Sequence, residues 1–395
     1  MSRLPSLNIL LVTPSSPLYP ANGTQQRSAL LYDALCSMGR VHVLGIHQGA
    51  SNETATQRSG YHAEVCWRQG PFGWNKYRPE TSLTRLAEQQ LPISMNEYDV
   101  IVGRYLNPIS KLDLSHAAPT LVDLDDLGYA YPLRSSWALP SMNHLRGLYG
   151  QRLAARQLTR FSHYLFLCAR DRERHPDLPG DTLPNIPYIR PSRPEPPVPS
   201  NQLLFVGSLW YRPNQDGINY FLTHVWPRIR THNPEATLLL AGAAPTTLLE
   251  RWSQIPGVHA PGFVQDLEAS YRDSAAVIAP IYSGGGTNIK VLEAVAHRRP
   301  CIVSPFCYAG FAEAFDGYHD LYVAGNDSEF VTGCLSFLSD QTAARRHTDR
   351  ALEVLDRHYS LELYQEILQR NVRQLLAQNG GGMCQPLSDS RGPFS

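Results

Sequence analysis

The sequence predicts an α/β protein made of two doubly wound domains, and two observations carry this prediction. Short apolar runs typical of strands alternate with amphipathic helical stretches, and the alternation occurs both before and after a proline-rich stretch. That stretch, residues 184–199, holds seven prolines, which resist helices and central strands and so mark a linker. We therefore expect a first domain over residues 1–190, which includes the start of the linker, and a second over 200–358. A crossing C-terminal helix over 359–378 and a disordered tail over 379–395 complete the prediction.

The first domain opens with a strand–helix–strand unit. Leu7–Thr13 is a continuous apolar run bounded by a proline turn, as buried parallel strands are. Gln26–Met38 has apolar residues at helical spacing, and we expect Gly39 to end that helix before a strand at Val41–Ile46. Residues 51–92 show no regular pattern. The other expected elements of this domain are strands over Tyr98–Gly103, Pro119–Asp123 and His163–Cys168, and a helix over His144–Arg160.

The same pattern restarts after the linker, with a strand at Gln202–Val206 and a helix at Gln215–Arg230. Leu361–Gln378 carries an apolar stripe and is the expected crossing helix. Doubly wound sheets bind ligands at the carboxyl ends of their strands, so two such domains predict an enzyme with a cleft. The remaining expected elements are strands over Ala236–Ala241, near Val258, and over Ala276–Pro280 and Cys301–Val303, and helices over Leu267–Ser274 and Asn288–His297.

The composition narrows the function classes. Thirty-five basic and 35 acidic residues give zero net charge, which argues against a protein dominated by contacts with nucleic-acid phosphates. No apolar run approaches the ~20 residues that span a bilayer, and the apolar part of the N-terminus is too short for a secretory signal. The seven cysteines show no Cys-x-x-Cys pair and no zinc-ligand spacing, as expected of reduced thiols in a cytoplasmic protein.

The strongest local signal is a glycine triplet, Gly284–Gly286, between a predicted strand and a predicted helix. Backbone N–H groups at a helix start, together with the helix dipole, form an anion site. Thr287 and Asn288 can cap the helix or donate to a phosphate. Further along the helix, a carboxylate at Glu293 can accept both hydroxyls of a ribose, and Lys290, one of three lysines in the chain, precedes it by one turn. The simpler alternative is a flexible loop, a capped helix and a solvated glutamate.

Four segments in this order resemble the GT-B-fold glycosyltransferases, in particular the retaining, family-4-like group that uses nucleotide-sugar donors. They are Leu183–Pro187, Phe205–Asn214, Gly262–Val264 and Gly285–Glu293. The resemblance covers most of the second domain and extends more weakly into the first. It implies the GT-B fold, in which two Rossmann-like domains face a central cleft and a C-terminal helix crosses back.

The resemblance assigns the donor to the second domain and the acceptor to the first. Gly262–Val264 matches a turn whose backbone contacts the donor base, and Gly285–Glu293 occupies the family's Glu-x7-Glu motif. In the first domain, the loop around Gly23 resembles the glycine-rich loop that faces the donor phosphate and the acceptor, and Arg27 opens the following helix. The donor-binding residues implied in this way are Gly23, Gly207, Val264, Gly285, Gly286, Thr287, Asn288 and Glu293.

The chain departs from the commoner family pattern at two points. The first glutamate of the motif, which usually approaches the donor sugar, is Gly285 here. The loop after Gly207 lacks the usual Arg…Lys pair that binds the diphosphate, and we expect Arg212 and Lys290 to share that role. Asn214, beside Arg212, is expected to be a plain helix N-cap.

Two strand ends of the first domain carry charged candidates. Arg104 directly follows a strand and is expected to face the cleft, with a structural arginine as the alternative. Asp123 also ends a strand, where a carboxylate could orient or deprotonate an acceptor hydroxyl. The Asp-x-Asp of Asp123 and Asp125 is also the metal–nucleotide signature of the other glycosyltransferase fold, GT-A, which leaves the second domain unexplained. Asp125 or Asp126 could instead cap a helix.

These features predict a hexosyltransferase that moves a sugar from a nucleotide diphosphate sugar to a hydroxyl of a glycan, a glycolipid or a small molecule. No metal site and no obligatory cofactor are expected. The resemblance implies retention of anomeric configuration, and front-face attack assisted by the leaving phosphate fits a sequence with no evident nucleophile. A nucleotide-sugar epimerase of the same fold and a catalytically silent nucleotide-sugar-binding protein are the alternatives. The expected catalytic residues are Lys290, Arg212, Asp123 and Arg104.

A basic face follows the predicted helix His144–Arg160 and continues beyond it. Such a face is usually only solvated, but it could also hold the protein against anionic lipid that carries a lipid-linked acceptor. We expect a cytoplasmic protein, with peripheral contact at the cytoplasmic face of a membrane as a further expectation. The basic residues are Arg146, Arg152, Arg156, Arg160, Arg170, Arg172 and Arg174.

Overall fold

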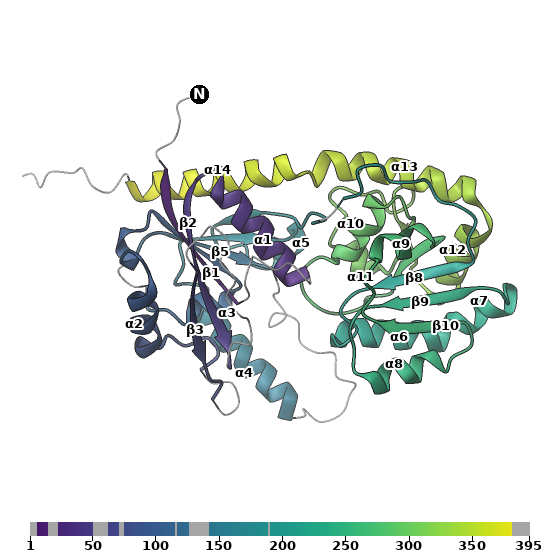
Figure 1. Ribbon diagram of the computed structural model, residues 1–395, viewed down its shortest axis with the longest axis horizontal. Coiled ribbons are helices and arrows are strands. Elements are labelled where there is room, and N and C mark those ends of the chain that lie inside the picture. The colour runs from purple at the N-terminus through teal and green to yellow at the C-terminus, as the bar shows by residue number, and fades with distance from the viewer. Residues whose placement is uncertain are drawn as a thin grey trace, which may run out of the picture.

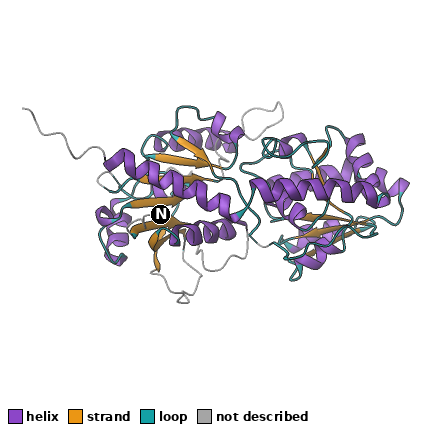
Figure 2. Cartoon of the chain, turned by 90° about the horizontal axis from the view of Figure 1, so that it is seen from above, coloured by secondary structure: helices purple, strands orange, loops and turns teal. Residues whose placement is uncertain are grey.

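The chain forms two α/β domains, each built on a parallel sheet with helices packed on both faces (Figures 1 and 2). The structure is a computed structural model, and its architecture confirms the predicted fold class. The structure describes residues 6–14, 23–49, 62–70, 75–114, 117–125, 142–188 and 190–380.

The first sheet has seven strands in the order β3-β2-β1-β4-β5-β6-β7. The order reverses between β1 and β4, which is the point where doubly wound sheets open a crevice for ligands. The first residue of β2, Gly39, must be glycine because a Cβ there would lie 2.1 Å from the carbonyl oxygen of Leu7. The strands are β1 Leu7–Thr13, β2 Gly39–Gln48, β3 His62–Trp67, β4 Val100–Arg104, β5 Thr120–Leu124, β6 His163–Phe166 and β7 Gly180–Thr182.

Side chains of β1 alternate between two cores, as the twofold period of a strand requires. Ile9 and Leu11 join the core that includes the apolar face of α1, whereas Leu10 and Val12 join the core under α2 and α3. β3 and α2 fall in the stretch 51–92, which had no readable pattern in the sequence. The helices of this domain are α1 Gly23–Cys36, α2 Thr81–Gln90, α3 Leu106–Ser110, α4 Met142–Gln157 and α5 Ala169–Glu173, with a 3-10 helix over Met95–Glu97.

The second sheet repeats this plan with six strands in the order β10-β9-β8-β11-β12-β13. Its order reverses between β8 and β11, so the two sheets each offer a switch point at the carboxyl ends of their central strands. The strands are β8 Gln202–Val206, β9 Thr237–Ala241, β10 Val258–Gly262, β11 Ala276–Ala279, β12 Cys301–Val303 and β13 Tyr322–Val323.

The helix predicted over Gln215–Arg230 is two helices, broken at Val225. Pro227 lacks the backbone N–H that a continuous helix needs, and its ring would clash with the preceding turn. Proline is tolerated in the first turn of a helix, which is where it lies in the second of the two. The helices of this domain are α6 Arg212–His224, α7 Trp226–His232, α8 Thr246–Ser253, α9 Leu267–Arg272, α10 Ile289–Ala296, α11 Pro305–Tyr308 and α12 Asp327–Ser339.

Two long helices close the chain: α13, Gln341–His358, lies over the second domain, and α14, Leu361–Gly380, crosses back over the first (Figure 1). Asn371 of α14 holds the crossing in place, since its Oδ1 lies 2.7 Å from Nε2 of the buried His163 on β6. Residues 379 and 380 of the predicted tail belong to α14, and 381–395 lie outside the described residues.

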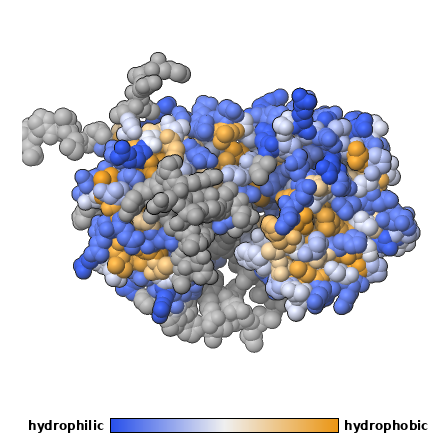
Figure 3. Space-filling view, in the orientation of Figure 1, coloured by the Kyte–Doolittle hydropathy of each residue, from blue (hydrophilic) through white to orange (hydrophobic). Residues whose placement is uncertain are grey.

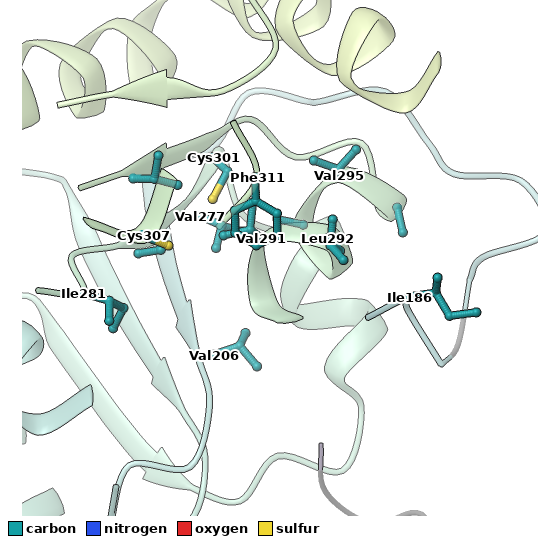
Figure 4. Packing of buried hydrophobic residues seen from close by; sticks show 14 of the residues in the cluster. Ile186, Val206, Val277, Ile281, Val291, Leu292, Val295, Cys301, Cys307 and Phe311 are labelled. Carbon is teal, nitrogen blue, oxygen red and sulfur yellow. The ribbon is translucent and has the colours of Figure 1, made fainter. Parts of the chain in front are cut away.

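The apolar face of α10 fixes the helix that later carries the candidate site. Val291, Leu292 and Val295 are buried against the second sheet, where Val277 of β11 and Cys301 of β12 lie beside them (Figure 4). Each such aliphatic side chain contributes roughly 1.5–3 kcal/mol on burial. The N-terminus of α10 is therefore held firmly at the carboxyl edge of the sheet.

Hydrophilic residues predominate on the face shown in Figure 3, with groups of apolar residues on both domains. In the described part of the chain, no helix is both long enough and apolar enough to span a membrane. Arg152 and Arg156 of the expected basic face are exposed on α4, whereas Arg170 is half-buried and hydrogen-bonds the second domain. Contact of this face with lipid stays a prediction.

Candidate active site

A cavity of about 460 Å³ lies between the domains, at the carboxyl ends of the central strands of both sheets. This volume lies in the range of small-molecule pockets, roughly 300–1,000 Å³. The first domain contributes residues of α1 and the ends of β4 and β5, and the second contributes the loops after β8 and β11. The lining residues are Gln25, Gln26, Arg27, Leu30, Tyr105, Asp125, Asn185, Ile186, Gly207, Ser208, Trp210, Tyr211, Asn214 and Gly285–Lys290.

The glycine loop, Gly285–Asn288, forms one wall and leads into α10. Asn288 is the N-cap of α10, but its side chain accepts no capping hydrogen bond. The first N–H groups of α10 are therefore not satisfied by a side-chain cap, which leaves them suited to an anion. Gly286 has φ of +68°, and a Cβ there would lie 2.8 Å from the carbonyl oxygen of Asp125. Glycine at this position thus allows the two domains to approach each other closely.

Lys290 is buried in the same wall, with a side chain that is 5% exposed. Its Nζ donates a hydrogen bond of 2.8 Å to Oδ1 of Asn214 and lies 4.2 Å from the centre of the Phe205 ring. Burial lowers the pKa of Lys290 to about 8, although nearby Cys307, Cys301 and Glu293 act in the opposite direction. Lys290 is therefore a cation that the protein holds at the cavity with little water around it.

Glu293, one turn further along α10, is partly buried and is not among the described residues that line the cavity. Its Oε2 accepts a hydrogen bond of 3.1 Å from the hydroxyl of Tyr271. Burial raises the pKa of the Glu293 carboxyl, while Tyr271 and Lys290 oppose the rise. Its expected contact with a ribose stays a prediction.

Two expected donor contacts lie away from the cavity. The Arg212 side chain is 76% exposed and pairs with Asp216 one turn along α6, with Nε 2.8 Å from Oδ1. Arg212 is not among the described residues that line the cavity, and its expected share with Lys290 in binding the diphosphate stays a prediction. Val264 follows β10 and packs partly against the core, outside the cavity lining.

Asp123 and Arg104 also differ from their expected places. They are register partners on neighbouring strands, so their side chains share one face of the sheet. Arg27 reaches Asp123 with two hydrogen bonds, Nη2 to Oδ1 at 2.7 Å and Nε to Oδ2 at 2.9 Å. Arg104 lies 3.5 Å from the same carboxylate, and both Asp123 and Arg104 are 0% exposed. The two residues form a buried ion network behind the cavity wall instead of facing the cleft.

Asp125, two residues further on, is the carboxylate that reaches the cavity. Burial would raise its pKa, but Arg104, which hydrogen-bonds it, and Arg27 outweigh that effect and hold the pKa below its usual range. The side chain of Tyr105 also hydrogen-bonds Asp125. Tyr105 has φ of +66°, a strained value for an aromatic residue, and such strain is concentrated at functional sites. The sequence favoured a helix cap at Asp125, whereas the structure places it at the cavity. Asp126 lies outside the described residues.

Hydrogen bonds from Arg170 and Asn185 join the first domain and the linker to the glycine loop and to α11 of the second domain. Arg170 donates from Nη2 to the carbonyl oxygen of Gly286 at 3.1 Å and from Nη1 to that of Phe306 at 3.3 Å. Asn185 donates from Nδ2 to Oγ1 of Thr287 at 3.3 Å. The glycine loop is thus positioned partly by the other domain.

Gly23 begins α1, and the eight residues before it lie outside the described part of the chain. The cavity wall from this helix is made by Gln25, Gln26 and Arg27. Within the described ranges, no group of three or more His, Cys, Asp or Glu side chains is arranged to hold a metal ion.

Two facing parallel-sheet domains, a cavity between them and a crossing C-terminal helix define the GT-B class of glycosyltransferase folds. Residues 200–340 match the family described as Glycosyl transferases group 1. The chain therefore has the GT-B fold, and residues 200–340 of its second domain are similar to the group 1 glycosyl transferases. The GT-A alternative is wrong, because it leaves this second domain unexplained.

Solved structures with the same fold extend over nearly the whole chain. Sucrose-phosphate synthase from Thermosynechococcus elongatus matches with a TM-score of 0.71 at 16% identity, covering 95% of this chain and 100% of that one. A structure described as trehalose-6-phosphate from E. coli bound with UDP-2-fluoro glucose matches with a TM-score of 0.63 at 13% identity, covering 93% and 99%. At these identities the matches show a shared fold.

A relative in sequence is an uncharacterised 44.6 kDa protein in the cps region of Klebsiella pneumoniae. It is 21% identical over 178 residues, which are 43% of this chain and 45% of the relative. The match thus spans less than half of either protein.

Proposed function

We propose that this protein transfers a sugar from a nucleoside-diphosphate sugar to an acceptor hydroxyl. The observation that carries the proposal is the wall of the cavity formed by the uncapped start of α10, the glycine loop Gly285–Asn288 and the buried ammonium of Lys290. Backbone N–H groups, a helix dipole and a fixed cation together suit a diphosphate. A UDP-sugar bound to the E. coli protein of the same fold supports this class of donor.

Lys290 and the glycine loop would act mainly on the leaving group. As the bond between the anomeric carbon and the β-phosphate oxygen breaks, negative charge builds up on the diphosphate. Hydrogen-bond donors and cations that are already in place stabilise this charge without reorganising, and this stabilisation is usually the largest electrostatic contribution to such a reaction. We therefore propose that Lys290 supplies the positive charge without an obligatory metal or other cofactor.

The acceptor would approach from the first domain, where Asp125 faces the glycine loop. A Cβ on Gly286 would lie 3.5 Å from Oδ1 of Asp125, so this carboxylate lies beside the proposed phosphate site. We propose that Asp125 accepts a hydrogen bond from the attacking hydroxyl and orients it, the role expected of Asp123. The acceptor oxygen then bonds to the anomeric carbon while its proton passes to the departing phosphate.

Retention follows if this attack occurs on the face that the phosphate leaves. A double displacement would instead need a carboxylate nucleophile on the opposite face. Of the described residues that line the cavity, Asp125 is the one carboxylate, and Arg104 and Tyr105 both bind it. A carboxylate tied in this way is suited to orienting a hydroxyl and poorly suited to attack, which supports the front-face route.

The test begins with thermal shifts of the purified protein in the presence of UDP-, GDP-, TDP- and ADP-sugars. The donor that stabilises the protein is then incubated with a panel of glycosides, lipid-linked sugars and small alcohols, with and without EDTA. We expect release of the nucleoside diphosphate and an α-linked product from an α-linked donor in both cases. A new nucleotide sugar formed without acceptor would indicate an epimerase, and binding without turnover would indicate a silent binding protein.

A further inference from the structure

We propose that Asn214 is the positioning residue for Lys290: its side-chain amide fixes the ammonium at the cavity wall and favours its charged form. The role of Lys290 toward a diphosphate rests on the proposed function, but the positioning of Lys290 by Asn214 does not. The sequence predicted only an N-cap at Asn214. The structure instead gives the N-cap position of α6 to Tyr211 and places Asn214 inside the first turn.

Both ends of the Asn214 amide are engaged, so its orientation is defined. The side chain is buried, at 6% exposure, and its Nδ2 donates a hydrogen bond of 2.9 Å to the carbonyl oxygen of Ser208. A carbonyl only accepts, so the NH2 end must face Ser208 and the oxygen must face Lys290. The Asn214 side chain thereby ties the loop after β8 to the cation on α10.

Among the described residues, Oδ1 of Asn214 is the hydrogen-bond acceptor that holds the Lys290 ammonium. The ring of Phe205 on β8 lies 4.2 Å from the ammonium, and the absence of a side chain at Gly207 leaves room for it, because a Cβ there would lie 3.3 Å from Nζ. The titratable groups that face Lys290 are Glu293 on its own helix, Cys301 on β12 and Cys307 on α11. Tyr271 already donates to Glu293.

The amide of Asn214 can orient the Lys290 ammonium without neutralising its charge. A carboxylate partner at 2.8 Å would neutralise the ammonium, whereas the Asn214 oxygen orients it and leaves its charge available to an anion. Burial lowers the pKa of Lys290 to about 8, and we expect loss of the Asn214 acceptor to lower it further, because the hydrogen bond favours the charged form. Asn214 would thus set both the position of the Lys290 ammonium and the pH range over which it stays charged.

The test uses the scarcity of lysine, since Lys76, Lys111 and Lys290 are the only three in the chain. Protein labelled with ¹³C,¹⁵N-lysine gives three side-chain signals, and Lys290→Arg assigns one of them. Titration from pH 6 to 11 should show the Lys290 midpoint falling in Asn214→Ala, which removes the acceptor, and rising in Asn214→Asp, which supplies a negative charge. Gln215→Ala is the matched control, because Gln215 holds Trp210 of the same loop without touching Lys290.

The second measurement is UDP affinity as a function of pH. We expect Asn214→Ala to bind UDP about tenfold more weakly at pH 8, corresponding to a lost charge-assisted hydrogen bond, and the difference to shrink at pH 6. If Asn214→Ala does not fold, Asn214→Ser provides the same comparison. An unchanged Lys290 titration in both variants would overturn the inference. A shifted titration in a protein that binds none of the four nucleoside diphosphates would keep the inference and reject the proposed function.

Discussion

Arg170 of the first domain donates a hydrogen bond of 3.1 Å to the carbonyl oxygen of Gly286 in the second. The same guanidinium holds Phe306 O and lies 3.2 Å from Oδ1 of its neighbour Asp171. The glycine loop that would bind the donor is therefore fixed in part from outside its own domain. This arrangement couples the donor site to the relative position of the two domains.

Replacing Arg170 should weaken donor binding without unfolding either domain. Arg170→Ala removes the contact with Gly286 while leaving the packing of α10 intact, so we expect UDP to bind about 3- to 10-fold more weakly. Calorimetric titration measures this change. Arg172→Ala is the control, since Arg172 lies on the same helix with an exposed side chain. Equal affinities for the Arg170 variant and the control would show that the contact does not position the loop.

Glu293 provides a test of the ribose contact that the family resemblance implies. Glu293→Ala should reduce UDP affinity at least about tenfold, because a charged acceptor for two hydroxyls is lost. The same change should matter little for 2′,3′-dideoxy-UDP, which has no hydroxyls to offer. Affinities of both nucleotides for both proteins form a double-mutant cycle. An equal loss for the two nucleotides would point to a packing defect around Tyr271 instead.

Donor binding should have a bell-shaped dependence on pH. Lys290 must be protonated, so affinity for a UDP-sugar falls as pH rises through about 8. Glu293 must be ionised, so affinity also falls in acid, at a pH above the usual carboxyl range because burial raises its pKa. Lys290→Met should flatten the alkaline limb and Glu293→Gln the acid limb. A profile that keeps both limbs in both variants would contradict these assignments.

Asp123 and Asp125 should give opposite phenotypes. Asp123→Asn leaves the buried guanidinium of Arg27 without its hydrogen-bonded carboxylate, which we expect to cost about 3–5 kcal/mol of unfolding free energy. Asp125 keeps 17% exposure, and without it Arg104 would still have Asp123 3.5 Å away, so Asp125→Asn should cost less stability than Asp123→Asn and instead slow transfer about 100-fold. Urea unfolding and turnover with the acceptor found above separate the two effects. Comparable stability losses for both variants would place Asp125 in the structural network.

The fold class could be predicted from the sequence because each strand and helix carries its own apolar pattern within one short segment. β1, β5 and β12 lie almost where their apolar runs predict them. The stretch 51–92 was unreadable because β3 carries polar and apolar residues on an edge strand and α2 is short. The break at Val225 was also missed, although Pro227 signals it.

The candidate site divides in the same way. The glycine loop and Lys290 were recognisable because their chemistry lies in one contiguous segment. Pairings between distant segments were not: nothing near Asp123 in the sequence shows that Arg27 is its partner, 96 residues away. Where β5 ends also decides which carboxylate reaches the cavity: Asp123 lies within the strand, whereas Asp125 comes directly after its end, and this is why Asp125 lies at the surface of the cavity in place of Asp123.

The most direct measurement of the central claim is the response of the three lysine signals to a nucleotide. ¹³C,¹⁵N-lysine-labelled protein is titrated with UDP, GDP, TDP and ADP at pH 7. If the donor diphosphate binds at the glycine loop, the Lys290 signal shifts with the nucleotide that binds, while those of Lys76 and Lys111 stay in place. Binding that leaves the Lys290 signal unmoved, or no binding of any of the four, would contradict the account.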